Sequence, residues 1–464
     1  MNLKCNLPDI DTNDPFKNDL LNRRQYGEIL TTLVKATEKG GTLSINAEWG
    51  YGKTTFIRMW EARLKRDGYS TIYLNAWEND YAQDPFMALV DEVLEQLKSS
   101  DFSSEKKQIL LAATDILVGI AKAIPHTAFI GQIGEAIKKG VEKTWEDRIA
   151  LQEYRTYKDV VNEFKDKLQS AVSKLSPDKP LIIFVDELDR CRPNYAIEFL
   201  ERIKHLFSID NIVFVLSVDK QVLLESIKCI YGSSEIQADN YLRRFIDLEF
   251  SLPVPNTEEF VQYQFNNHGL DKYIQKHRNE LHHFYNTNYA ALLTNILAAC
   301  FRAKTRSLRD IEKYFNRLDV VLHAININGV YLDIIVFLTY LYMFEEDIFQ
   351  KIYNLEYTKT ELVRNIESAI CMPNIDINSF ESRTASSVLA SILWQYEMEL
   401  EYAENNTLIL PRQKENLENI NLSILPENYF NNIYKEAKNK MTDRALKTYC
   451  QCIRISDNFH YDYD

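Results

Sequence analysis

The stretch that most constrains the fold of this 464-residue chain is 42–55, TLSINAEWGYGKTT. Residues 42–46 alternate between apolar and polar side chains, which predicts a short buried strand, and residues 54–64 carry the apolar spacing of a helix. Between them, Gly50 and Gly52 predict a tight turn at 47–52, because glycine adopts backbone angles that a side chain forbids. The stretch therefore predicts a strand, a turn and a helix in immediate succession.

The predicted turn ends in Gly50-x-Gly52-Lys53-Thr54, close to the phosphate-binding pattern G-x-x-x-x-G-K-[ST]. Backbone N–H groups and the helix N-terminus would wrap the phosphates, the lysine would contact the β- and γ-phosphates, and the threonine hydroxyl would hold Mg²⁺. Ala47 replaces the first glycine of the pattern, and since alanine tolerates most backbone angles except positive φ, the turn should still form if Ala47 is extended. A helix-opening turn without a ligand is the alternative. The predicted binding residues are Glu48, Trp49, Gly50, Tyr51, Gly52, Lys53, Thr54 and Thr55.

Further strands and helices alternate along the first half of the chain. Strands are expected at 70–77, 180–185, 211–216 and 248–252, and helices at 20–36, 86–97, 144–175, 196–207, 221–230 and 241–245. This alternation favours an α/β fold with a doubly wound, mostly parallel sheet. The apolar run at 180–185 is typical of a central strand that is covered on both faces.

The alternation stops after Pro255, and helical spacing alone continues to the end. We expect an N-terminal arm at 1–19, a nucleotide-binding core at 20–255 and a helical insertion within it at about 82–178. A helical lid is expected at 256–325 and a helical C-terminal domain at 326–464.

Composition excludes some functions. The net charge of −13 argues against a broad surface that binds nucleic acid. A local basic groove is the alternative. Seven dispersed cysteines and the lack of a signal sequence after Met1 predict a cytoplasmic protein. The most apolar long segment, 109–137, is interrupted by Asp115, Lys122 and Pro125. A spanning helix needs about 20 apolar residues, so we expect two packed helices or a reversible membrane contact there.

An acidic pair, Asp186-Glu187, directly follows the apolar strand at 180–185. Beside a phosphate turn, the first acid would hold Mg²⁺ and the second would orient the attacking water. Two solvated acids at a strand end are the alternative. Ser217 and Asp219 follow the next strand, where they could contact the γ-phosphate or the water, or form a plain strand-exit turn.

Three groups of arginines compete to stabilise the developing negative charge. Arg243 and Arg244 precede the last strand and could reach the nucleotide of a neighbouring subunit. Arg306, just before a capping box at 307–310, could swing in from the lid. The third group, Arg190 and Arg192, flanks the acidic pair, and for every group a surface ion pair is the alternative.

Several segments together resemble the KAP family of P-loop NTPases. They are AEWGYGKTT at 47–55, LNAW at 74–77, FVDELDRCRP at 184–193, AIEFLERIK at 196–204, VFVLSVDKQV at 213–222, DPFKNDLLNRRQY at 14–26, YLRRFI at 241–246 and TRSL at 305–308. The resemblance spans about residues 8–325. Glu187 stands where the family often has a second aspartate, and the broken apolar segment departs from members with membrane helices.

The resemblance implies an ATPase that uses Mg²⁺, related to the AAA+ and STAND groups. It also implies a setting in bacterial anti-phage defence with a partner effector protein. We further expect a homo-oligomer, in which hydrolysis drives a conformational or assembly change. A nucleotide-gated scaffold with slow hydrolysis and a small-molecule kinase remain the alternatives. On this reading the catalytic residues are Lys53, Glu187, Asp219, Arg243, Arg244 and Arg306, and the metal ligands are Thr54 and Asp186.

Overall fold

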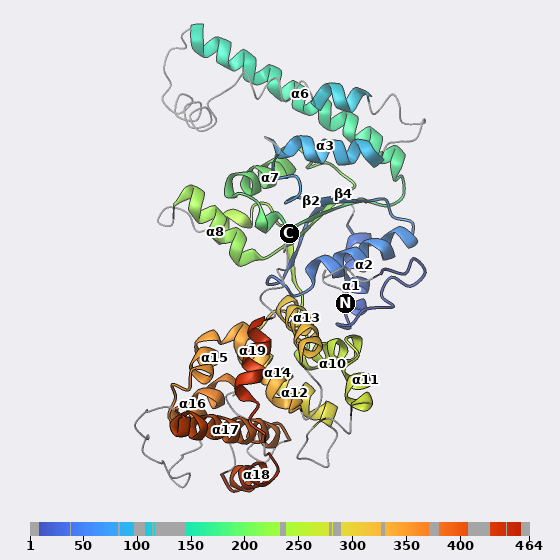
Figure 1. Cartoon of the computed structure of the whole chain (residues 1–464). Coiled ribbons are helices and arrows are strands. Elements are labelled where there is room, and N and C mark those ends of the chain that lie inside the picture. Colours follow the sequence, from blue (N-terminus) through green and yellow to red (C-terminus); the bar gives the residue numbers. More distant parts are fainter. Residues whose placement is uncertain are drawn as a thin grey trace. The chain divides into compact units, whose positions relative to one another are not determined.

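The computed structural model of the chain divides into two compact units (Figure 1). One contains Leu7–Val254 and the other contains Pro255–Asp464. The structure describes residues 9–37, 39–81, 84–96, 107–113, 116, 145–232, 238–277, 281, 289–325, 330–370, 380–406, 427–441 and 443–455. The boundary between an expected lid and a C-terminal domain at 325 is not tested by this division and stays a prediction.

A five-stranded parallel sheet forms the centre of the first unit. The strands are β1 (Gly41–Asn46), β2 (Thr71–Asn75), β3 (Leu181–Asp186), β4 (Ile212–Val218) and β5 (Leu248–Ser251). Their order is β2-β3-β4-β1-β5, and all pairs are parallel. The strand that precedes the glycine turn, β1, is therefore separated by β4 from β3, which ends in the acidic pair. All these strands point their carboxyl ends toward one edge, where ligands bind in such sheets.

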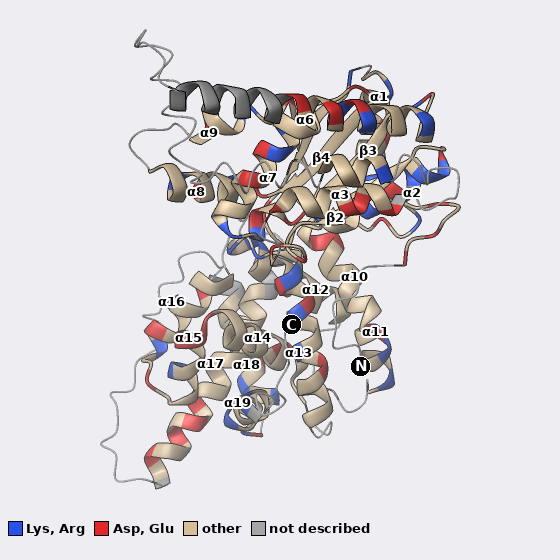
Figure 2. Cartoon of the chain, turned by 90° about the horizontal axis from the view of Figure 1, so that it is seen from above, with Lys and Arg blue, Asp and Glu red and all other residues tan. Residues whose placement is uncertain are grey.

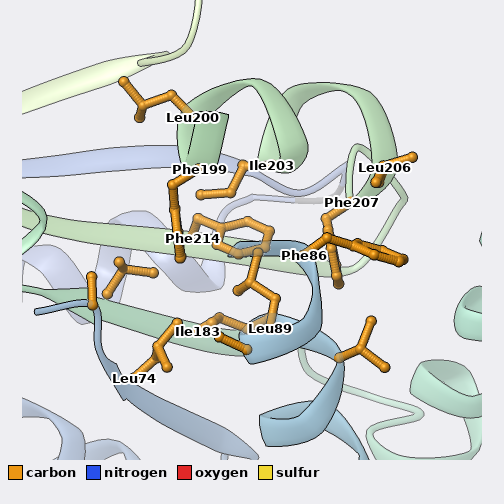
Figure 3. Packing of buried hydrophobic residues seen from close by; sticks show 14 of the residues in the cluster. Leu74, Phe86, Leu89, Ile183, Phe199, Leu200, Ile203, Leu206, Phe207 and Phe214 are labelled. Atoms are coloured by element: carbon orange, nitrogen blue, oxygen red, sulfur yellow. The ribbon is translucent and has the colours of Figure 1, made fainter. Parts of the chain in front are cut away.

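Helices cover both faces of the sheet, as the doubly wound prediction requires (Figure 1). One face packs against α1 (Arg24–Lys35) and α2 (Lys53–Arg66), with the Trp60 indole set edge-on to the Phe184 ring at 5.3 Å. The other face packs against α3 (Pro85–Gln96), α6 (Trp145–Leu175), α7 (Pro193–Leu206) and α8 (Lys220–Tyr231). Figure 3 shows Phe86, Phe207 and Phe214 interdigitating in this second core. Two buried layers hold the strand ends in place.

The expected elements are confirmed apart from details at their ends. The helix predicted at 241–245 lies earlier, as α9 (Ala238–Leu242), so Arg243 and Arg244 follow it in a turn. A short 3-10 helix, Leu188–Arg190, was not expected, and it follows directly on the acidic pair. The first helix begins at Arg24 rather than near residue 20.

The expected insertion is helical where it is described, in α3, residues 107–113 and α6. Most of the apolar segment 109–137 lies outside the described residues, so a membrane contact there stays untested. Among the helices of the described residues, none is both long and apolar enough to cross a membrane.

The second unit is helical throughout its described parts. Its helices are α10 (Thr257–Asn267), α11 (Leu270–Lys276), α12 (Tyr289–Ala303), α13 (Leu308–Ala324), α14 (Leu332–Phe344), α15 (Glu346–Tyr353), α16 (Lys359–Ile370), α17 (Phe380–Asn406), α18 (Glu427–Lys440) and α19 (Leu446–Ile455). The predicted capping box is confirmed, since Ser307 caps α13 and Asp310 bonds back to its backbone. Helix α14 is apolar on nearly every side and packs against α12, α13, α15, α17 and α19.

Charges of both signs are interspersed along the described helices (Figure 2). The second half of α17 contains the acidic residues Glu397, Glu399, Glu401 and Glu404.

Asp333, in the first turn of the apolar helix α14, is fully buried, and burial raises the pKa of its carboxyl from 3.8 to about 6. The Tyr289 hydroxyl donates to Oδ1 at 3.2 Å. Because the pKa is higher in the folded state, the protonated carboxyl stabilises the fold fully below the unfolded-state pKa of 3.8. This stabilisation is lost as the pH rises through 6. We therefore expect Asp333→Asn to be up to about 3 kcal/mol more stable than the wild type at pH 8, with little difference near pH 4.

Urea unfolding at both pH values measures this effect. Asp347→Asn, an exposed carboxylate on α15, is the matched control and should change stability by less than about 0.5 kcal/mol at either pH. Equal stability of the Asp333→Asn variant and the wild type at pH 8 would show that ionisation of the buried carboxyl does not destabilise the fold.

Candidate nucleotide-binding site

The glycine turn has the backbone that the sequence predicts. Gly50 and Gly52 have φ angles of 80° and 76°, in the left-handed region that glycine adopts without strain. Ala47 is not among the positive-φ residues of the described chain, and its N–H donates to the Val218 carbonyl at 3.3 Å. The alanine is therefore compatible with this turn. Gly52 caps α2, so the free N–H groups of the helix face the interior of the turn.

Lys53 is buried at the start of α2. Its Nζ donates to the carbonyl of Ala47 at 2.6 Å and to that of Glu48 at 3.3 Å. Burial lowers the pKa of Lys53, while the carboxylates of Asp189, Asp219 and Asp186 oppose this shift. The ammonium group is thus held inside the turn and experiences the field of three acids, from the end of β3, the 3-10 helix and the residue after β4.

Asp186 is the last residue of β3 and is only 1% exposed. Its Oδ2 accepts a hydrogen bond from the Tyr73 hydroxyl at 2.9 Å, and Oδ1 accepts from the Glu187 N–H at 3.0 Å. Burial also raises the pKa of Tyr73 above its ordinary value. The carboxylate is fixed from two sides, and its remaining lone pairs can still accept bonds from a water.

Glu187 adopts a left-handed conformation, with φ of 60° and ψ of 24°. A non-glycine residue pays for this conformation, and such strain gathers at functional sites. Its Oε2 accepts from the Asn75 amide at 3.2 Å, and its Oε1 pairs with Arg190 at 3.0 Å. The predicted water-orienting acid is therefore aimed by the end of β2 and by the 3-10 helix.

Ser217 and Asp219 occupy the strand end between the two motifs. Ser217 lies in register with Asp186 on one side and Ile45 on the other. Its hydroxyl is buried and has no hydrogen-bond partner in the part of the chain that the structure describes. Asp219 instead caps α8, since its Oδ1 accepts from the Gln221 N–H at 3.1 Å. Ser217 is thus the freer of the two to contact a ligand.

Two further residues shape the turn although sequence reasoning gave them no role. The buried Asp189 accepts hydrogen bonds at Oδ2 from the Trp49 indole N–H and from the Asp219 N–H. Arg23, only 3% exposed, donates to the Gly52 carbonyl at 3.1 Å and to the Pro253 carbonyl at 3.4 Å. Burial lowers the pKa of Arg23 to about 10. The position of Asp189, three residues after Asp186, could have indicated a role in the site. No local sequence feature indicates such a role for Arg23.

The candidate arginines are distributed over both units. Arg190 pairs with Glu187 at the acidic pair, and Arg192 pairs with Asp80 at 3.0 Å. Arg243 is 73% exposed and pairs with Asp239 at 2.6 Å. The others engage local partners: Arg244 lies over the Tyr241 ring, and Arg306, in the second unit, pairs with Glu345 at 3.2 Å. Of these ion pairs, the one made by Arg190 involves the predicted catalytic acid.

The oxygen donors at the start of α2 and at the end of β3 fit Mg²⁺. Thr54 offers a hydroxyl and Asp186 a carboxylate, the hard oxygen ligands that Mg²⁺ prefers beside substrate phosphates. The unpartnered hydroxyl of Ser217 adds a further oxygen at the same edge. Within the described ranges, no group of three or more His, Cys, Asp or Glu side chains could hold a metal. A Mg²⁺ site whose remaining ligands are nucleotide phosphates and water does not need such a group of side chains.

The Trp49–Asp189 hydrogen bond ties the glycine turn to the 3-10 helix. We expect Trp49→Phe to raise the dissociation constant for ATP about fivefold, because the turn loses an anchor of about 1 kcal/mol while Trp49 is already half exposed. Isothermal titration calorimetry measures this change. Trp394→Phe is the control, since it removes an indole hydrogen bond, to the Met441 carbonyl, in the second unit. Equal affinities of all three proteins would contradict the role of this anchor.

A family profile described as KAP family P-loop domain matches residues 22–325. The chain is also 22% identical over 246 residues to the phage T7 exclusion protein of Escherichia coli (strain K12). That alignment covers 48% of this chain but 31% of that protein, so the chain spans under a third of the relative.

Two structures of the Aeropyrum pernix ORC2 protein also align with the chain. The structure of its ADPNP–ADP complexes gives 15% identity and a TM-score of 0.36 over 90% of this chain and 94% of that chain. Its ADP form gives 13% and 0.34 over 95% and 98%. This similarity is too distant to inform the site. The family match covers more than half of the chain, including the glycine turn and the acidic pair, and the chain belongs to the KAP family of P-loop domains.

Proposed function

We propose that this chain binds ATP with Mg²⁺, hydrolyses it, and uses hydrolysis to drive a conformational or assembly change. The observation that carries the proposal is the convergence at the sheet edge. The buried Lys53 of the glycine turn lies in the field of Asp186, Asp189 and Asp219. A phosphate turn that faces acids at neighbouring strand ends suits the transfer of a phosphoryl group to water.

Each residue has a defined task in this proposal. Lys53 exchanges its carbonyl partners for the β- and γ-phosphates, and the N–H groups at the start of α2 bind the same charges. Thr54 and Asp186 hold Mg²⁺, which neutralises phosphate charge when it is bound. Glu187 orients and polarises the attacking water, and the Ser217 hydroxyl donates to the γ-phosphate or to that water.

An arginine is expected to stabilise the charge of the transition state, an effect worth about 10³–10⁵ in rate. The exposure of Arg243 and Arg244 supports their supply to the nucleotide of a second copy in a homo-oligomer. Arg306 would first have to leave its ion pair with Glu345. We therefore favour Arg243 and Arg244, with oligomer formation as part of the activity.

The relative named phage T7 exclusion protein supports a setting in anti-phage defence. In such a setting the helical second unit would engage a partner effector protein. Its predominantly helical surface offers such a partner charged and polar contacts, for example at the exposed Glu401 near the end of α17.

Specific contacts favour a second candidate, a nucleotide-gated scaffold with slow hydrolysis. Glu187 is engaged by Asn75 and Arg190, and Lys53 is engaged by carbonyls of its own turn. Lys53 must change partners before it acts on a nucleotide, and Glu187 would have to give up its ion pair with Arg190. A chain resting in this arrangement would bind ATP and wait for a partner or a second copy.

The test is phosphate release from ATP by the purified full-length chain, with and without a chelator for Mg²⁺, beside Lys53→Ala and Glu187→Gln. Metal-dependent turnover that is lost in both variants is the expected result. ATP binding without turnover would favour the scaffold. No ATP binding at all would refute both functions.

A further inference from the structure

A chain of polar contacts leads from the middle of α2 to Asp186. Glu61 on α2 accepts from Arg58 at 3.1 Å, and the Arg58 guanidinium carbon lies 3.6 Å from the centroid of the Tyr73 ring. The Tyr73 hydroxyl then donates to Asp186 at 2.9 Å. Four side chains from α2, β2 and β3 are thus connected in one series.

The far end of this series is firmly held. Glu61 is only 5% exposed, yet its carboxylate is paired with Arg58 and Lys65 and accepts a hydrogen bond from the Thr71 hydroxyl at 3.3 Å. A buried charge with several donors keeps one orientation. It therefore fixes the guanidinium group, and a guanidinium stacked on an aromatic face fixes the plane of that ring.

The series begins on the same helix as the other predicted metal ligand, Thr54. Arg58 follows Thr54 by one helical turn, so both side chains lie on the same side of α2. Thr54 offers the hydroxyl donor, and Arg58 orients the tyrosine that holds the carboxylate donor. A shift of α2 as the turn receives phosphates would therefore be transmitted to Asp186 through Tyr73.

We propose that Tyr73, braced by Arg58 and Glu61, is a positioning residue that sets the orientation of Asp186 toward the Mg²⁺ of the bound nucleotide. The inference rests on the proposed function of the site. Without the hydroxyl, Oδ2 of a carboxylate that is 1% exposed loses its partner, and Asp186 turns away from the orientation that receives the metal's water shell.

The experiment measures binding of a non-hydrolysable ATP analogue while Mg²⁺ is titrated, so turnover is not needed. For Tyr73→Phe we expect the Mg²⁺ concentration at half-saturation to rise about tenfold, with binding of the analogue in chelator unchanged. The variant keeps the ring under Arg58 and removes only the hydroxyl. Tyr195→Phe is the matched control, because its buried hydroxyl has no partner within the described residues.

A second variant tests the inference without removing the Tyr73 hydroxyl, in case Tyr73→Phe misfolds. Arg58→Gln leaves the hydroxyl but removes the cation over the ring, and it should raise the Mg²⁺ requirement about threefold, with an effect that is not additive with Tyr73→Phe. A half-saturating Mg²⁺ concentration for Tyr73→Phe that is equal to or lower than that of the wild type would overturn the inference while the proposed function stands. If the wild-type chain itself binds the analogue without regard to Mg²⁺, the proposed function fails first.

Discussion

Glu187→Gln is expected to lower ATP turnover by about 10²–10⁴-fold while ATP still binds. The amide has the size of the carboxylate and can keep the hydrogen bond from Asn75. It carries no charge, however, so it cannot polarise the attacking water or accept its proton. It also loses the ion pair with Arg190. Binding survives because the phosphates contact the turn and Lys53, which this substitution leaves intact.

Single-turnover phosphate release and calorimetric ATP binding measure the two effects separately. Glu78→Gln is a close control, since Glu78 also accepts a hydrogen bond from Asn75, at 3.1 Å. Glu78 is exposed and lies in the turn that follows β2. Its turnover should stay within about twofold of the wild type. A Glu187→Gln chain that hydrolyses ATP at the wild-type rate would move the role of base to another acid.

Lys53→Ala has the second large expected effect, a loss of at least about 100-fold in ATP affinity together with turnover. The ammonium group is the one cation that the structure places inside the glycine turn among the described residues, held by the Ala47 and Glu48 carbonyls. Because the site is buried, a charge-assisted contact with phosphate is strong there. Its removal also leaves Asp186, Asp189 and Asp219 facing the phosphates without compensation.

Calorimetric titration with ATP checks this prediction, and thermal unfolding checks that the variant folds. Lys228→Ala on α8 is the control, because this exposed lysine pairs only locally with Glu225 and should bind ATP as the wild type does. Retained affinity in Lys53→Ala would mean that the buried ammonium serves the fold of the turn and not the nucleotide.

Much of the first unit could be predicted because its signals are local. Gly50 and Gly52 mark the turn through the backbone freedom of glycine, and the run at 181–185 marks a strand buried on both faces. Ser307 and Asp310 mark the start of α13 through a capping box that forms within four residues. Such features depend on residues that are close in the sequence, so they can be predicted without knowledge of the fold.

The details of the site could not be predicted, because its contacts join residues that are far apart. Tyr73 and Asp186 are separated by 113 positions, and Trp49 and Asp189 by 140. Asn75, which aims Glu187, resembles any polar residue at a strand end. The helix near Arg243 was misplaced because helical spacing over a few residues is a weak signal.

By itself, the sequence determined that the chain contains a phosphate turn, an acidic pair after a buried strand and alternating strands and helices. The tertiary structure decided which side chains meet. Parallel pairing in the order β2-β3-β4-β1-β5 aligns the strand ends, so Asp186 comes beside Ser217, and Lys53 enters the field of three acids. It also decided that Glu187 takes a strained backbone. Local preferences select elements, whereas the burial of two faces of one sheet selects the register in which their ends converge.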